Sequence, residues 1–63
     1  MTIETTAYLL TLEKLGKRTK ENTQEFGILL REFHARLLAE KLDGNIEVRF
    51  TIEDSVRRYG FRV

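Results

Sequence analysis

The sequence has no cysteine, no proline and no tryptophan among its 63 residues. Without cysteine, neither a disulfide nor a thiolate zinc site can stabilise the fold. A chain of this length buries only about 60% of the surface that its unfolded form exposes, so small domains usually need a disulfide, a metal or oligomerisation. A single histidine, without acids at ligand spacing, also argues against a structural metal. We therefore expect oligomerisation, no metal and no cofactor.

Long hydrophobic runs and a strong net charge are also missing. No apolar run approaches the roughly 18 residues of a membrane span, and the N-terminus lacks the basic and apolar regions of a signal peptide. The formal net charge is +1 although 33% of the residues are charged, so the global basic excess typical of nucleic-acid-binding proteins is missing. We expect one cytoplasmic domain over residues 1–63, without membrane contact.

Apolar residues at helical spacing predict a first helix near the N-terminus. It begins at Thr5 or Thr6 and ends at Leu15. Gly16 follows, and glycine suits the left-handed conformation of a C-terminal cap. Residues 17–21 then form the connection to a second helix.

The second predicted helix carries more apolar surface than one neighbouring helix can cover. It runs to Leu42 from Asn22, or from Thr19 one turn earlier, and the Asn22 side chain would cap its first turn. At 100° per residue, two apolar stripes arise, Phe26, Leu29, Leu30, Phe33 and Leu37 on one side and Ile28, Ala35, Leu38, Ala39 and Leu42 on another. A helix that is apolar on two sides must be covered on two sides, and a second copy of the chain would cover the second one.

The period of the pattern changes at Asp43-Gly44-Asn45. Downstream, four apolar residues alternate strictly with polar ones: Ile46, Val48, Phe50 and Ile52. Strict alternation is typical of a strand with one buried face. The segment 46–52 is therefore predicted to be a strand.

The last residues are open to two interpretations. In the preferred one, residues 53–55 form a turn into a second strand, in which Tyr59, Phe61 and Val63 alternate. In the rival one, Asp54 caps a single helical turn that runs through Tyr59 and is stopped by Gly60.

The predicted fold class is α+β, a two-helix hairpin followed by a C-terminal strand or a two-stranded β-hairpin. A lone β-hairpin is marginally stable in water and leaves two open edges. We therefore expect a symmetric homodimer. It would form through the second apolar side of the second helix or by pairing of terminal strands across a two-fold axis.

Basic residues gather in two segments in spite of the small net charge. Residues 14–20 contain four of them and residues 57–62 contain three, with no acid in either segment. Both segments could contact phosphates, and the candidate contacts are Lys17, Arg18, Lys20 and Arg57. The alternative is that each segment is a solvated face or answers acids across a dimer interface. The dipole of the first helix would also favour lysines near its end.

Arg57-Arg58-Tyr59-Gly60-Phe61 resembles part of the RNP1 strand motif of RNA-recognition motif domains. In that motif a basic residue comes first and aromatic residues flank a small one, so that exposed rings stack on bases. The resemblance implies a nucleic-acid contact at Tyr59. Arg58 stands where the motif has glycine, and Arg62 stands where it has an aliphatic residue. The structural alternative places Tyr59 and Phe61 on the core face of a β-hairpin.

No motif for catalysis, metal binding or a phosphate-binding loop is present. We therefore expect a protein that is not an enzyme. The preferred function is a small protein-interaction or regulatory module that acts as a homodimer and binds a protein partner. Aromatic and arginine side chains often dominate such interfaces, so the predicted contacts are Arg58, Tyr59, Phe61 and Arg62. The alternative is a nucleic-acid-binding protein that uses the basic clusters 14–20 and 57–62.

Overall fold

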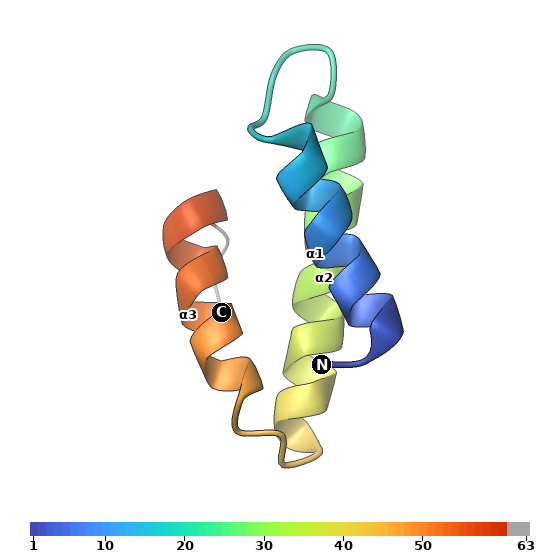
Figure 1. Cartoon of the computed structure of the whole chain (residues 1–63). Coiled ribbons are helices and arrows are strands. Elements are labelled where there is room, and N and C mark those ends of the chain that lie inside the picture. The colour runs from blue at the N-terminus through green and yellow to red at the C-terminus, as the bar shows by residue number, and fades with distance from the viewer. Residues whose placement is uncertain (61–63) are drawn as a thin grey trace.

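The structure is a computed structural model that describes residues 1–60. These residues form three helices joined by two short connections. α1 spans Ile3–Leu15, α2 spans Thr23–Leu42 and α3 spans Val48–Tyr59. α2 is the central helix, and α1 and α3 pack against it and run opposite to it (Figure 1). No strand occurs among residues 1–60. The predicted α+β class is therefore wrong, and the fold is an all-α, three-helix arrangement.

The first two helices confirm the predicted helical hairpin. α1 begins earlier than predicted because the Thr2 hydroxyl accepts a hydrogen bond from the Thr5 backbone N–H, at 3.1 Å, and caps the helix. Gly16 ends α1 with a φ of 80°, which side-chain-bearing residues rarely adopt. Asn22 is the residue before α2, as predicted. Its side chain, however, accepts from the Thr19 N–H at 2.7 Å and makes no capping bond to α2.

The alternating segment 46–52 does not form a strand: residues 46 and 47 form a turn, and residues 48–52 begin α3. Ile46 and Phe50 are four residues apart, and so are Val48 and Ile52, so the alternation also contains two pairs at helical spacing. Val48 and Ile52 are 0% and 4% exposed, whereas Ile46 and Phe50 are 73% and 70% exposed. A strand with one buried face would have hidden all four side chains on the same side. The strand prediction failed because seven residues are compatible with both periods.

Residues after Ile52 continue the helical period. Ser55 is buried and Val56 is half-buried, so both extend the apolar stripe that Val48 and Ile52 begin. The predicted turn at residues 53–55 is therefore the middle of α3.

The rival interpretation of the C-terminal region is right about where the helix ends. α3 ends at Tyr59, and Gly60 follows in the left-handed conformation with a φ of 74°. It is wrong about the start, since α3 begins six residues before Asp54, at Val48. Because Tyr59 is helical, the second strand does not begin as predicted. Residues 61–63 lie outside the described part of the chain.

The core lies along one side of α2. Its buried apolar side chains are Leu12, Phe26, Leu30, Phe33, Leu37, Val48 and Ile52. Four of them belong to the first apolar stripe predicted for α2. In the second predicted stripe, Leu38 is half-buried and the other four residues are exposed. The prediction that α2 is apolar on two sides is confirmed, and α1 and α3 cover only one of those sides.

Candidate functional site

The two basic segments of the sequence meet at one end of the molecule. The C-terminal ends of α1 and α3 and the connection between α1 and α2 all lie at this end (Figure 1). Six residues from these elements and from α2 line a pocket of about 160 Å³, here called the cationic pocket: Gly16, Lys17, Arg18, Phe26, Arg58 and Tyr59. Residues about forty positions apart in the chain thus form one surface.

Two aromatic rings form part of the wall of the cationic pocket. The rings of Phe26 and Tyr59 meet edge to face, with centroids 5.7 Å apart and planes at 66°. The Arg18 guanidinium lies over the Phe26 ring, 5.5 Å from its centroid, which is cation–π distance. Phe26 is buried and Tyr59 is half-buried. Tyr59 is therefore a packing residue at the end of a helix. The RNP1 resemblance implies an exposed ring on a strand, and this prediction is wrong.

Arg58 is held by two acids from different helices. Its guanidinium lies 3.3 Å from the Asp54 carboxylate one turn earlier and 3.7 Å from the Glu13 carboxylate of α1. All three side chains are about half exposed, so each pair contributes little to stability. The ion pairs of Arg58 mainly set the position of α3, because the contact with Glu13 joins α3 to α1.

The predicted protein contacts divide into two groups. Arg58 and Tyr59 both lie in the cationic pocket, where each is engaged within the molecule. Phe61 and Arg62 lie outside the described residues. Two of the four predicted contacts are therefore described by the structure, and these two lie together.

Helix dipoles favour some of the basic residues at this end. Lys14 and Arg57 lie in the last turns of α1 and α3, where the partial negative charge of free carbonyl groups favours a cation. Lys17, Arg18 and Lys20 come after the end of α1. Of these three, Lys17 and Arg18 line the pocket, whereas Lys20 is exposed outside it. Among the described residues, neither Lys17 nor Arg18 has a carboxylate partner.

Each helix also carries large apolar side chains on its outer face. The exposed ones within residues 1–60 are Met1, Ile3, Leu10, Ile28, Leu42, Ile46 and Phe50, which are 41–90% exposed. As many large apolar side chains are exposed as are buried in the core. Isolated exposed residues of this kind are ordinary. Most of these residues instead lie on helix faces. Ile3 and Leu10 of α1 line one shallow depression together with Met1, Thr6 and Ala7.

The longest of these faces belongs to α2. Its residues Ile28, Ala35, Ala39 and Leu42 are all exposed and are here called the α2 outer stripe. Ile28, Ala35 and Leu42 recur every seven residues, which is close to two helical turns, and they span about 21 Å. A large side chain therefore lies at equal distance on either side of Ala35. Ile28 and Leu42 are 56% and 88% exposed.

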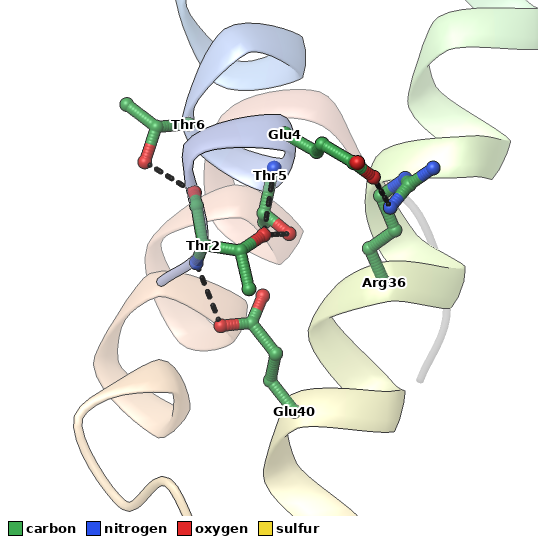
Figure 2. Close-up of polar contacts among 6 residues, drawn as sticks. All are labelled: Thr2, Glu4, Thr5, Thr6, Arg36 and Glu40. Carbon is green, nitrogen blue, oxygen red and sulfur yellow. Dashed lines mark hydrogen bonds and ion pairs between the residues drawn. The ribbon is translucent and has the colours of Figure 1, made fainter.

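A polar cluster joins the start of α1 to the second half of α2 (Figure 2). Arg36 donates a hydrogen bond to the Glu4 carboxylate at 2.6 Å, and its guanidinium lies 5.1 Å from the centroid of the Tyr8 ring. Glu40 accepts a hydrogen bond from the Thr2 backbone N–H at 3.1 Å. These contacts engage the charges of Arg36 and Glu40 within the molecule and set the position of the first turn of α1.

The electrostatics of this cluster are structural. The neighbouring Tyr8 side chain is the largest cause that raises the pKa of Arg36, and the Glu4 carboxylate also raises it. A raised arginine pKa contributes stability that is fully present below the pKa of the unfolded residue, which lies far above neutral. Arg36 therefore stays charged near neutral pH, and its contacts provide no switch there. We assign the cluster to the fold.

No family model, curated protein or solved structure matches this chain. Within residues 1–60, no group of three or more His, Cys, Asp or Glu side chains is arranged to hold a metal ion. None of the three helices described combines the length and the apolar character needed to cross a membrane. The cationic pocket and the α2 outer stripe are therefore the two candidate sites.

Proposed function

We propose that this protein is a non-enzymatic protein-interaction module that self-associates through the α2 outer stripe. The observation that carries the proposal is the exposure of Ile28 and Leu42 on the side of α2 away from the core, with Ala35 midway between them. A cytosolic location is part of the proposal and rests on the composition alone. Pairing of terminal strands is no longer part of it, because α3 occupies that region up to Tyr59.

A second copy of the chain is the proposed occupant because the stripe is symmetric about Ala35. A two-fold axis brings a surface onto itself. If two α2 helices lie antiparallel with the axis at Ala35, Ile28 of each copy faces Leu42 of the other. Alanine at the crossing point lets the helices approach closely. In this register Arg31 falls level with Ala39 of the other copy and opposes no like charge.

The expected affinity follows from the area that such a contact removes from water. Burying an exposed Ile or Leu side chain contributes about 1.5–3 kcal/mol, and the two copies supply four such side chains. Association costs an estimated 4–15 kcal/mol in lost freedom of motion. The four side chains together contribute about 6–12 kcal/mol, which exceeds the association cost when that cost lies in the lower part of its range. We expect a net gain of about 5.5 kcal/mol, which corresponds to a reversible dimer with a dissociation constant on the order of 100 µM.

Replacing Ala35 with glutamate is expected to abolish self-association. The substitution places two carboxylates at the centre of the proposed contact, where they would be desolvated and repel each other. Ala35 is exposed in the single chain, so the variant should keep its helix content by circular dichroism. Sedimentation equilibrium from about 10 µM to 1 mM should show the wild-type mass rising above 7.4 kDa, while Ala35→Glu stays monomeric.

Leu10→Glu is the matched control for this experiment. Leu10 is also an exposed apolar residue, but it lies on the outer face of α1. This variant should associate as the wild type does. A wild-type chain that is monomeric throughout the range contradicts the proposal, and so does equal loss of association in both variants.

Nucleic-acid binding is the second candidate function, favoured by the meeting of the two basic segments at one end. Lys17, Arg18 and Lys20 would contact phosphates from one side, and Arg57 would contact them from the end of α3. Because the Tyr59 ring packs against Phe26, such binding would use the nucleic-acid backbone and would not depend on sequence. The acids paired with Arg58 weaken the attraction at this end.

A titration with labelled single- and double-stranded oligonucleotides tests this second candidate. Binding that neutralises phosphates must weaken steeply as salt rises, with log K falling by about 0.9 per log unit of salt for each contact on a duplex. The combined change Lys17→Gln, Arg18→Gln and Lys20→Gln should therefore reduce both the affinity and the slope. No binding at low salt would remove this candidate.

A further inference from the structure

We infer that the cationic pocket binds a phosphate monoester, with Lys17 and Arg18 as its principal contacts. The inference does not depend on self-association, because none of the pocket residues belongs to the α2 outer stripe. It differs from the nucleic-acid candidate in its ligand, because a monoester is dianionic near neutral pH whereas each phosphodiester carries one charge.

The charges around the pocket leave two cations available. Three of the six lining residues are basic and none is acidic. Glu13 and Asp54, the two acids that form ion pairs with a lining residue, are both paired with Arg58. Lys17 and Arg18 have no carboxylate partner among the described residues, so a bound dianion would match their two charges.

The size and walls of the pocket select a small anionic group over a flat ring. Its volume of about 160 Å³ is about half the ~300 Å³ lower limit of ordinary small-molecule sites. The buried Phe26 is covered by the Arg18 guanidinium and by the edge-to-face contact with Tyr59, which leaves little ring surface on which a nucleobase could stack. Recognition would therefore rest on charge and hydrogen bonds.

Phosphate suits these contacts better than a carboxylate does. A phosphate monoester offers three acceptor oxygens, so it can accept from a planar guanidinium and from an ammonium group at the same time. Arg18 and Lys17 supply these two kinds of donor. Gly16 leaves space at the wall, because nothing lies within 4 Å of the position that a Cβ atom would take there.

Nuclear magnetic resonance titration with phenyl phosphate tests the inference, with the phosphate group of the probe in the pocket and its ring outside. At about pH 7.5, where the monoester is mostly dianionic, we expect saturable shifts of the amide signals of residues 16–20 and 58–60. The expected dissociation constant is on the order of 1 mM. At about pH 5, below the second pKa of the ester, the affinity should fall several-fold. Sodium chloride at matched ionic strength should produce no saturable shift.

Arg18→Gln and Lys41→Gln form the matched pair of variants. Both residues are exposed and each substitution removes one positive charge, but Lys41 lies at the opposite end of α2. Arg18→Gln should weaken phenyl phosphate binding about 10-fold, whereas Lys41→Gln should leave it unchanged. The inference is overturned if the two variants lose affinity equally or if the shifts do not saturate. Binding of a single-stranded oligonucleotide through Arg18, without any response to phenyl phosphate, would also overturn it and would support the nucleic-acid candidate.

Discussion

Replacing Phe33 with alanine is expected to cause a large loss of stability. Phe33 is 0% exposed and is the largest of the fully buried side chains described. A Phe to Ala change in a core costs about 3–5 kcal/mol, from lost transfer free energy and from the cavity left behind. At roughly 0.05–0.15 kcal/mol per residue, a chain of 63 residues has a free energy of unfolding of about 3–9 kcal/mol. The substitution therefore removes a large part of the stability, or all of it.

Phe50→Ala provides the matched control, because it makes the same chemical change at a position that is 70% exposed. Its free energy of unfolding should stay within about 0.5 kcal/mol of the wild-type value. Urea unfolding followed by circular dichroism at low protein concentration measures both variants. If Phe50→Ala costs as much as Phe33→Ala, the helical register of α3 is refuted. A strand over residues 46–52 would bury Phe50 beside Ile52 and predicts that result.

Replacing Glu53 with proline is expected to disrupt α3 and to destabilise the whole protein. Glu53 is exposed in the middle of α3. Proline there removes one helical hydrogen bond and clashes with the carbonyl group four residues earlier, at a cost of about 3 kcal/mol or more. Because α3 supplies the buried Val48 and Ile52 to the core, its loss also exposes the apolar surface of α2. We expect a large fall in the urea midpoint.

Glu53→Ala separates the backbone effect from the loss of charge. This variant removes the same carboxylate but keeps the backbone N–H, and alanine is the best helix former. Its stability should therefore equal or slightly exceed that of the wild type. A proline variant with an unchanged urea midpoint would contradict the presence of α3.

The helical hairpin of α1 and α2 could be predicted because its signals lie close together in the chain. The apolar stripe of α2 extends over many turns, and glycine at position 16 supplies the positive φ that ends α1. The earlier start of α1 also has a local cause, since the Thr2 hydroxyl caps it. The exposed apolar face of α1 could also have been predicted from the sequence, because Ile3 and Leu10 are seven residues apart and lie away from the core residue Leu12.

The identity of α3 could not be predicted from residues 46–52 alone. The two apolar pairs, Ile46 with Phe50 and Val48 with Ile52, support a strand and a helix equally well. β-branched and aromatic residues there even favour a strand. Burial against α2 decided in favour of a helix, because a helix buries Val48 and Ile52 and its buried face continues through Ser55.

The candidate site could also be predicted from the sequence only in part. The basic segments are plain in the sequence, but a β-hairpin would have placed the second one differently. Because α3 is a helix that runs alongside α2, its last turn returns to the connection between α1 and α2. The contact between Glu13 and Arg58, 45 residues apart, follows from that path.

The sequence by itself determined the two long helices, the residues that end them and the two apolar sides of α2, because capping and periodicity depend on near neighbours in the chain. Only the tertiary structure decided that the third segment is a helix, which of its apolar residues are buried, and that Arg18 and Arg58 line one pocket. These features depend on which surfaces pack together, and residues distant in the chain determine that packing.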